Sequence, residues 1–230
     1  MEKQMFQSKN IRSNIISWLP IKKKDVVLQI GEDSTEITQM LSEMSDSVFT
    51  IRTWDEMATL GTEKFDYVIL IGTLEKARTF VDEHQAQYII LKTAYERLKE
   101  NGQMIFAIDN CFGLRFWSGS KEENSQKYFY SIENNTLQRG EGLLSATQIE
   151  NLLKKVGCRE WKCYYPYPDY KITRCIYSDD FLPKKGELSY NFHNFEGLRL
   201  NLLDEEKVFD HLIEQNKFSE FANSYLYIVR

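Results

Sequence analysis

The 230-residue sequence lacks the features that mark several large classes of protein. It has no apolar run near the roughly 20 residues that span a bilayer, and its first ten residues are polar and charged, unlike a signal peptide. We therefore expect no membrane span and a cytoplasmic location. Its four cysteines are scattered without Cys-x-x-Cys spacing, and its three histidines lie far apart. The sequence thus predicts free thiols and no metal site.

Basic residues are slightly outnumbered, with 29 Lys and Arg against 34 Asp and Glu and a formal net charge of −5. A dedicated nucleic-acid-binding protein would need a basic face, so no nucleic-acid partner is expected. Hydrophobic residues make up 42% and aromatic residues 13% of the chain, which is too much for a disordered protein. The length suits one domain with a buried core of useful size.

Short apolar runs alternate with helical patterns in the first half of the chain. Buried strands are predicted at 26–30, 47–52, 65–71 and 103–108. Helices are predicted at 11–19, from about 34 to 44, at 54–60 and over a long stretch from about 74 to 98, with Asn101–Gly102 as a turn. This alternation is typical of an open, doubly wound α/β sheet, in which ligands bind at the carboxyl ends of the strands.

The second half of the chain departs from this alternation. The polar segment at about 110–142 is too long for a plain connection and predicts a lid or a substrate loop. Further elements are predicted as a helix at 145–155, a strand at 161–165, a helix at 204–215 and a final strand at 223–229. Two prolines indicate that 164–170 is not regular throughout. We interpret the chain as one domain, 1–230, with an insertion at about 169–220.

Glycines follow two of the predicted strands, at Gly31 and Gly72. A ligand that lies across a strand end needs glycine there, because a Cβ would collide with it, and the next helix offers free N–H groups. An ordinary strand-to-helix turn explains Gly31 equally well. Glu32 and Asp33 would repel the pyrophosphate of a dinucleotide, which disfavours an NAD-dependent oxidoreductase. They would tolerate a ligand with an ammonium and a sulfonium, such as S-adenosylmethionine.

Polar residues also follow the second and fourth strands. Asp109 is placed to accept a proton from a substrate hydroxyl or amine, although an Asx turn explains it nearly as well. A carboxylate for ribose hydroxyls is expected after the second strand, but the sequence has Arg52 there, and Asp55 is the nearest acid. The aromatic segment 164–170 forms either a wall for a sugar ring or packing under a loop.

Several longer stretches resemble one family. They lie at 11–20, 27–31, 65–75 (FDYVILIGTLE), 98–110, 112–119 (FGLRFWSG), 164–171 (YYPYPDYK), 177–183 and 221–226. Together they look like the class I S-adenosylmethionine-dependent methyltransferases of bacterial cell-surface glycan clusters, which are often fused to or beside glycosyltransferases. The resemblance covers nearly the whole chain, and its later motifs are more specific than the glycine at residue 31.

The resemblance implies one methyltransferase-like domain with a Rossmann-like sheet of seven strands, mostly parallel, ending in an antiparallel hairpin. It implies S-adenosylmethionine as the cofactor, and an acceptor-binding role for the loop at about 110–142. The cofactor-binding residues expected from it and from position are Gly31, Glu32, Asp33, Arg52, Asp55, Gly72, Thr73 and Glu75. The expected substrate-binding residues are Asn110, Phe112, Arg115, Tyr167 and Asp169, with Asp109 as the catalytic base.

The sequence departs from this family in the cofactor half. Only Gly31 remains of the glycine-rich loop, and the ribose-binding acid is missing after the second strand. The stretch between Ile30 and Phe65 is too short for two helices and two full strands, so an element is expected to be lost there. Two functions stay open: a methyltransferase for a sugar or other small polar acceptor in surface glycan biosynthesis, with a glycosyltransferase as partner, or a catalytically degenerate binding or scaffold subunit.

Overall fold

The structure is a computed structural model that describes residues 11–31, 35–135, 142–191 and 199–230. Within these residues, seven strands form one sheet in the order β2-β1-β3-β4-β7-β5-β6. The strands are β1 (Val26–Ile30), β2 (Ser47–Ile51), β3 (Phe65–Ile71), β4 (Leu98–Asp109), β5 (Trp161–Tyr167), β6 (Cys175–Ser178) and β7 (Ser224–Val229). Strands β2, β1, β3 and β4 pair in parallel, whereas β7 pairs antiparallel with β4 and β5, and β6 pairs antiparallel with β5. The sheet confirms the predicted Rossmann-like class.

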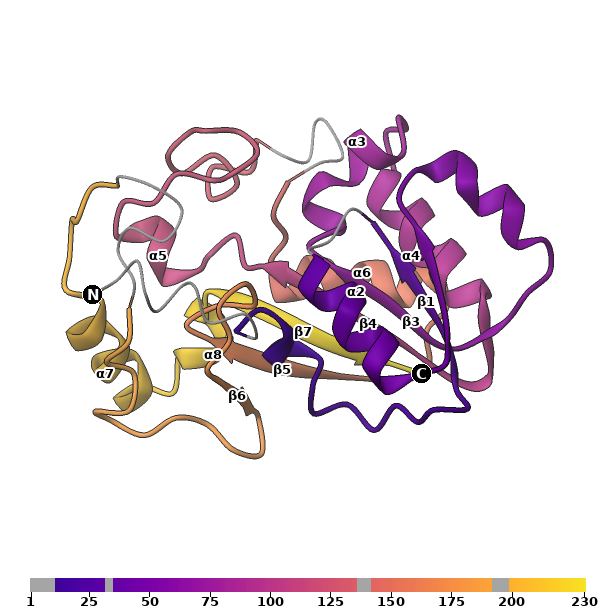
Figure 1. The fold of residues 1–230 in the computed structure, drawn as a ribbon. Helices are drawn as coiled ribbons and strands as arrows, with labels where there is room; N and C mark the ends of the chain where they lie inside the picture. Colours follow the sequence, from indigo (N-terminus) through magenta and orange to yellow (C-terminus); the bar gives the residue numbers. More distant parts are fainter. Residues whose placement is uncertain (1–10, 32–34, 136–141, 192–198) are drawn as a thin grey trace.

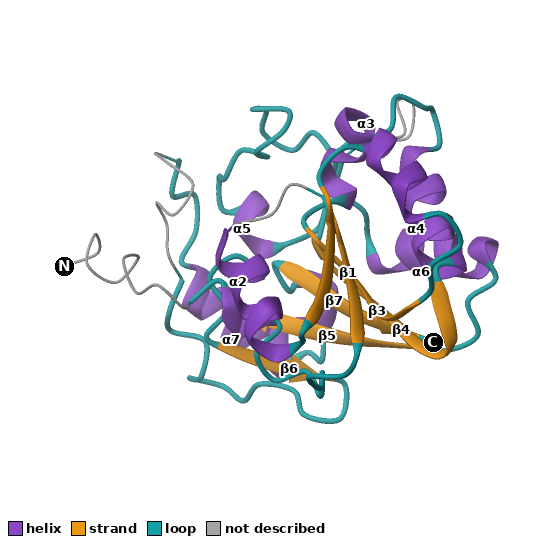
Figure 2. Cartoon of the chain, turned by 45° about the vertical axis from the view of Figure 1, so that its right-hand side comes forward, coloured by secondary structure: helices purple, strands orange, loops and turns teal. Residues whose placement is uncertain are grey.

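Helices cover both faces of the sheet (Figure 1). The α-helices are α2 (Thr35–Met44), α3 (Ala77–Phe80), α4 (Ala86–Glu96), α5 (Leu114–Trp117), α6 (Ala146–Val156), α7 (Glu205–Glu214) and α8 (Phe218–Phe221). The 3₁₀-helices are η1 (Ser13–Ile15), η2 (Trp54–Leu60) and η3 (Leu74–Lys76). Figure 2 shows α2 on one side of the strands and α4 with α6 on the other. Among the residues described, no helix has both the length and the apolar composition that a bilayer span requires.

Alternate residues of the central strands point to opposite faces of the sheet, and both faces are apolar. In β1, Val27 packs in a cluster with Ile37 and Leu41 of α2. The next residue, Leu28, packs in the cluster that contains Ile90 of α4. Burial on both faces explains why the parallel strands read as continuous apolar runs. The two helical layers leave the carboxyl ends of the strands as the edge at which a ligand can approach.

The half of the sheet that contains β2 is short, as the sequence predicted. Between β1 and β3 the described residues form α2, β2 and η2, which is one full strand and one α-helix rather than two of each. As a result, β2 is an edge strand of the sheet. A groove lies between α2 and the strands β1 and β2.

The prediction of one long helix over 74–98 is wrong. The chain forms η3 and α3, then an extended residue at Val81 (φ −130°, ψ 109°), and only then α4. Val81 is buried in the core, and the four residues that follow it are exposed and polar. Helical periodicity continues across this break because the apolar residues on both sides of it face the same core.

The prediction of a turn at Asn101–Gly102 is also wrong. Strand β4 already begins at Leu98, and a register shift opposite the start of β3 accommodates the extra residues. Glycine is required at residue 102 because an added Cβ would lie 2.8 Å from the carbonyl oxygen of Phe65. The predicted helix at 11–19 is likewise shorter, since its only helical residues are those of η1, followed by hydrogen-bonded turns.

Strand β5 continues past its predicted end at Tyr165 and includes Pro166. Proline is tolerated because β7 pairs with β5 only as far as Tyr164, so no ladder bond to β7 needs the missing N–H. Past Tyr167 the chain leaves regular structure, as its prolines indicated. The strand β6 was not predicted from the pattern, because its four residues are too few to show a period.

Helix α6 begins at its predicted cap. The Ser145 hydroxyl accepts a hydrogen bond from the backbone N–H of Gln148 (3.3 Å), and the Gln148 side chain accepts one from the backbone N–H of Ser145 (2.8 Å). This capping box satisfies two N–H groups that the helix itself cannot bond. Gly157, with φ 94°, ends the helix in the left-handed conformation that glycine favours.

Candidate functional site

Two hollows lie at the carboxyl edge of the sheet. The first, here called the strand-end cavity, has a volume of about 360 Å³. It is lined by Glu75, Lys76, Arg78, Thr79, Asp109, Glu122, Glu123, Asn124, Ser125, Lys127, Tyr130, Gly142 and Leu143. The second, here called the β1–β2 groove, has a volume of about 540 Å³ and is lined by Gln29, Gly31, Thr35, Thr38, Gln39, Ser42, Thr50 and Arg52. Both volumes fall in the range of small-molecule sites.

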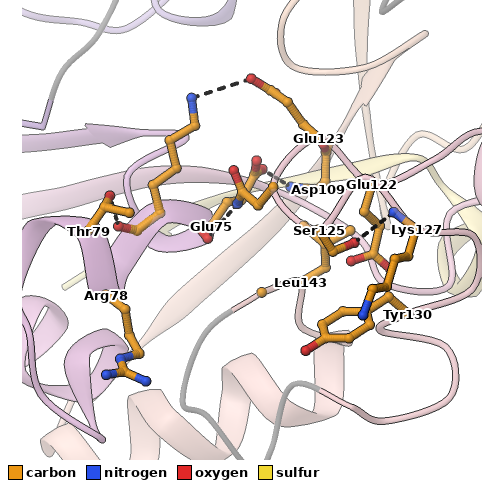
Figure 3. Close-up of a pocket in the computed structure, with 13 residues that line it drawn as sticks. Glu75, Arg78, Thr79, Asp109, Glu122, Glu123, Ser125, Lys127, Tyr130 and Leu143 are labelled. Carbon is orange, nitrogen blue, oxygen red and sulfur yellow. Dashed lines mark hydrogen bonds and ion pairs between the residues drawn. The ribbon is translucent and has the colours of Figure 1, made fainter.

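The strand-end cavity lies between η3 with α3 and the loop that follows β4. Figure 3 shows Glu75 and Asp109 in the middle of this site, with Arg78 to one side and Lys127 with Tyr130 to the other. The loop therefore does border a candidate ligand site, as the sequence suggested.

Glu75 ties two strand ends together at the bottom of the cavity. One oxygen of its carboxylate accepts a hydrogen bond of 2.6 Å from the backbone N–H of Asp109. In the part of the chain that the structure describes, no hydrogen bond engages the second oxygen. Burial raises the pKa of Glu75, although Lys171 and the Asp109 N–H pull it down. Glu75 is thus a buried carboxyl group that retains hydrogen-bonding capacity.

Beside Glu75 lies a set of ion pairs, here called the ion network. Its carboxylates are Asp109, Glu123 and Asp169, and its cations are Lys76, Arg115 and Lys171. All of these side chains are buried except those of Lys76 and Glu123, which are about half exposed. Arg115 pairs with Asp109 and, at 2.8 Å, with Asp169. Lys171 lies 3.4 Å from a carboxylate oxygen of Asp109 and 2.9 Å from one of Glu123. The network joins β4, α5 and the segment after β5 into one rigid wall.

Charges within the network fix its ionisation. Burial alone would raise the pKa of Glu123, but the ammonium groups of Lys171 and Lys76 overcome it and hold the value at about 2. Burial alone would lower the pKa of Lys171, but Asp109 beside it raises that pKa well above its ordinary value. Both residues therefore stay charged at neutral pH.

The β1–β2 groove is lined mainly by hydroxyl and amide groups. Gln29 is nearly fully buried at its base, and its Oε1 accepts a hydrogen bond of 2.9 Å from Thr38. Its Nε2 has no hydrogen-bond partner among the described residues. A buried amide with an unused donor indicates a place where a bound ligand would complete the hydrogen bonding.

Side chains of the chain itself cover the Cα atoms of both strand-end glycines. A Cβ added to Gly31, whose φ is +107°, would lie 2.3 Å from Oγ1 of Thr73, and this hydroxyl donates a 2.7 Å hydrogen bond to the carbonyl oxygen of Ile30. A Cβ added to Gly72 would lie 2.7 Å from the hydroxyl of Tyr170. Internal packing thus requires glycine at both positions.

Within the part of the chain that the structure describes, no buried acid lies at the end of β2 beside the groove. Arg52 lines the groove and is exposed, and Asp55 is exposed in η2. The neighbouring Glu56 accepts a hydrogen bond of 2.7 Å from the Arg52 backbone N–H, which lowers the pKa of its carboxyl. Glu56 therefore serves the start of η2 rather than the groove.

Of the residues predicted for the site, the structure brings together Glu75, Asp109, Arg115 and Asp169. Other predicted residues have structural partners. Asn110 is fully buried and donates hydrogen bonds to the carbonyls of Glu220 and Ala222 (each 2.8 Å), and Phe112 is partly exposed. The Tyr167 hydroxyl accepts a hydrogen bond of 2.8 Å from the backbone N–H of Tyr190. Glu32 and Asp33 lie outside the described residues.

Sequence reasoning named Arg115 but missed the other two cations of the ion network, Lys76 and Lys171, and the amide of the groove, Gln29. Lys171 follows Asp169 and Tyr170 directly, and two predicted acids, Asp109 and Asp169, were already placed in one site. Because buried carboxylates need paired cations, this crowding of acids could have pointed to Lys171. Gln29 had a signal too, since it is the polar residue inside an otherwise apolar strand. Within the described ranges, no group of three or more His, Cys, Asp and Glu residues is arranged to hold a metal ion.

Comparison with solved structures places the fold in a class. The chain is similar to a SAM-dependent methyltransferase from Archaeoglobus fulgidus, with a TM-score of 0.56 and 14% identity over 99% of this chain and 96% of that one. It is similar to a cyclopropane-fatty-acyl-phospholipid synthase-like protein from Lactobacillus casei, with a TM-score of 0.52 and 10% identity over 99% and 92% of the two chains. A third similar structure is the CcbJ methyltransferase from Streptomyces caelestis, with a TM-score of 0.50 and 10% identity over 95% and 88%.

The fold is therefore that of the SAM-dependent methyltransferases over nearly the whole chain. Identities this low define the fold and leave the activity to be argued from the site. No protein-family model and no curated protein matches the sequence.

Proposed function

We propose that the protein is an S-adenosylmethionine-dependent methyltransferase that acts on a small polar acceptor. The observation that carries this proposal is the pair of hollows at the carboxyl edge of a methyltransferase fold. Gly31 lines the groove and Glu75 lines the cavity. Thr73 follows the end of β3, the strand end between the two hollows, and its side chain contacts Gly31. We assign the groove to the cofactor and the cavity to the acceptor.

The residues of the β1–β2 groove suit the nucleoside part of the cofactor. Hydroxyl groups of Thr35, Thr38 and Thr50 can donate to and accept from ribose oxygens and base nitrogens. The unused Nε2 of Gln29 offers one further donor. Bound S-adenosylmethionine would supply a methyl group on a positively charged sulfur.

The ion network supports a positively charged ligand. Three carboxylates and three cations pair within it, and Glu75 beside it adds a fourth carboxylate for which the described residues provide no ion pair. The raised pKa of Glu75 is the local sign of this imbalance, since burial without enough cations disfavours its charged form. A sulfonium bound near this edge would be stabilised by the surplus carboxylate.

The predicted role of Asp109 as the catalytic base remains a proposal. Its carboxylate is 2% exposed and pairs with both Arg115 and Lys171, which compete with a substrate proton for it. We give Asp109, Arg115 and Asp169 the task of holding the cavity wall in place. Glu75 suits proton acceptance better, because its raised pKa brings it nearer to working pH.

A second candidate is a methyltransferase-like binding subunit without activity. The observations that favour it are the side chains of Thr73 and Tyr170, which cover Gly31 and Gly72, and the exposed Arg52 at the position expected for a ribose-binding acid. In that case the groove would bind no cofactor and the ion network would serve stability alone.

A narrower version of the proposal keeps the biological setting that the sequence suggested. In this version the acceptor is a sugar or another glycan in bacterial surface-glycan biosynthesis. The partner is a glycosyltransferase, and the location is cytoplasmic. Support for it comes from the resemblance of the 112–119 and 164–171 motifs, the second of which supplies Asp169 and Lys171 to the ion network.

Calorimetric titration of the full chain with S-adenosylmethionine separates the two candidates. The methyltransferase proposal predicts a dissociation constant between about 1 µM and 1 mM, the range of typical KM values. Thr50→Val, which removes one groove hydroxyl, should weaken binding about 3- to 10-fold, the worth of one hydrogen bond. Thr59→Val, an exposed threonine outside the groove, is the control and should not change it. No heat of binding at millimolar cofactor would favour the inactive subunit, and unaltered binding by Thr50→Val would place the cofactor elsewhere.

A further inference from the structure

The strand-end cavity separates its charges by depth. Its floor is acidic, and its acids are each at most 3% exposed: Glu75, Asp109 and Glu122. Its rim carries three half-exposed or exposed cations, Lys76, Arg78 and Lys127, and one exposed acid, Glu123, which pairs with Lys76. A ligand that fits this lining would carry a positive group at its inner end and a negative group at its outer end.

The three acids of the floor differ in how far their charge is already met. Asp109 pairs through one oxygen with both Arg115 and Lys171, so two cations meet its charge. Glu122 uses one oxygen on the backbone N–H of Ser131 (2.6 Å) and the other on its hydroxyl (2.7 Å). For Glu75, the described residues show one hydrogen bond, to the backbone N–H of Asp109, which engages one of its two oxygens. Glu75 is therefore the floor group that can bind a ligand.

Two cations of the rim can meet a negative group. Lys76 is turned to Glu123, at 3.3 Å. The ammonium of Lys127 lies 5.2 Å from the ring centre of Tyr130, and within the described residues it forms no ion pair. Arg78 lies on the other side of the cavity (Figure 3) and pairs at 3.1 Å with Asp82, a residue that is itself almost fully exposed. Exposed pairs of this kind exchange partners at little cost.

We propose that the strand-end cavity binds a small zwitterion, with its ammonium group at Glu75 and its phosphate or carboxylate group at Lys127 and Arg78. This zwitterion would be the acceptor of the proposed methyltransferase. The inference rests on that proposed function only where it calls the ligand an acceptor. Binding itself needs no cofactor.

Physical chemistry favours this ligand over a neutral sugar. A buried carboxylate with one unfilled oxygen is best satisfied by a charged donor, and burial has already raised the pKa of Glu75 for want of one. A hydroxyl would donate a hydrogen bond there but would bring no charge. Guanidinium and ammonium groups at the rim match phosphate oxygens in the same way.

Three probes of similar size test the two ends separately in the absence of S-adenosylmethionine. They are glucosamine 6-phosphate, glucose 6-phosphate, which lacks the amine, and glucosamine, which lacks the phosphate. Calorimetry of the full chain should show binding of glucosamine 6-phosphate, with each of the other two at least about tenfold weaker, the loss expected for one charged hydrogen bond. Equal binding of the first two probes, or no binding of the first at millimolar concentration, would overturn the proposal.

Two variants place the ligand in this cavity. Glu75→Gln keeps an oxygen for the Asp109 N–H and removes the charge, so it should bring glucosamine 6-phosphate and glucose 6-phosphate to within about twofold of each other. Lys127→Gln should weaken both phosphates at least about threefold. Lys121→Gln is the matched control, because Lys121 lies over the Tyr128 ring at the same 5.2 Å but does not line the cavity.

Retained discrimination in Glu75→Gln, or an equal effect of Lys127→Gln and Lys121→Gln, would refute the assignment. Calorimetry with S-adenosylmethionine alone reports on the methyltransferase proposal separately, so failure of one does not imply failure of the other. Circular dichroism of each variant confirms that a loss of binding is not a loss of fold.

Discussion

Replacing Arg115 by Met tests the ion network at its centre. The Arg115 side chain is 8% exposed and bridges Asp109 and Asp169, whose side chains are 2% and 6% exposed. Methionine keeps an apolar stem of similar length, so the main loss is the guanidinium charge with its hydrogen bonds. The substitution leaves two buried carboxylates with one cation fewer.

The size of the effect follows from which carboxylate loses its cation. Asp109 still has the ammonium of Lys171 at 3.4 Å. Among the described residues, Asp169 retains backbone N–H donors alone, from Lys171 at 2.7 Å and Ile172 at 3.1 Å. Removing one partner of a buried pair costs about 3–5 kcal/mol, and the remaining Lys171 puts the expected loss near the lower end, about 3 kcal/mol.

Urea unfolding followed by circular dichroism measures this loss. Arg115→Met should lower the midpoint with little change in the slope of the unfolding free energy against urea. Arg159→Met, at an exposed arginine, is the control and should stay within about 0.5 kcal/mol of the parent protein. The double variant Arg115→Met with Asp169→Asn no longer has the unpaired carboxylate. Its loss of unfolding free energy should therefore be smaller than the sum of the two single losses by about 1–3 kcal/mol.

Additive effects of Arg115→Met and Asp169→Asn, to within about 0.5 kcal/mol, would refute the reasoning, because residues that form one ion pair must couple. A loss below about 1 kcal/mol for Arg115→Met would also contradict burial of the pair.

Three further substitutions test other parts of the structure. Glu123 has its pKa held at about 2 although burial alone would raise it, so its stabilising effect is present above its ordinary pKa of 4.5 and is lost as the pH falls from about 4.5 to 2. Glu123→Gln should therefore lose less stability than the parent protein in this window, measured by urea unfolding at pH 6 and pH 3. Ser145→Ala removes the cap of α6 and should cost about 1 kcal/mol in thermal unfolding. Gly31→Ala should cost about 2–4 kcal/mol, from the positive φ and the contact with Thr73, whereas Gly61→Ala, with positive φ but nothing within 4 Å, should cost only about 1 kcal/mol.

Each of these predictions has a contrary result. Parallel acid dependence in Glu123→Gln and the parent protein would show that Glu123 is not held in its charged form. An unchanged midpoint for Ser145→Ala, measured beside Ser189→Ala as an exposed control, would mean that the cap does not form. Equal losses for Gly31→Ala and Gly61→Ala would mean that the space above Gly31 is open.

Strands β1 and β3 were predicted to the residue because both faces of each strand are largely buried. Most positions of β1 and β3 are therefore apolar, so Val26–Ile30 and Phe65–Ile71 stand out from polar surroundings. The capping box at Ser145 is a local signal that tertiary structure did not override. The break at Val81 left no such signal, because a buried valine suits a helix and an extended turn equally well.

The site was predicted in part, and for a different physical reason than the structure gives. From the sequence, glycine at residue 31 was predicted to leave room for a ligand. In the structure, the side chain of Thr73 occupies the space that a Cβ of residue 31 would need. Asp109 was singled out because it ends a buried strand, and the structure does place it beside the cavity. Asp109 pairs with Arg115 and with Lys171, which lies 62 residues further along the chain, and pairing at that separation leaves no mark in local periodicity.

Hydrogen exchange with and without S-adenosylmethionine tests the central claim most directly, because it reports both binding and its place. Saturating cofactor should slow exchange in the peptides that end β1 and β2 and in the one that contains Gly72–Glu75, and should leave the peptide of β6 unchanged. Absence of protection at millimolar cofactor, or protection confined to segments away from the β1–β2 groove, would contradict the assignment of this groove to the cofactor.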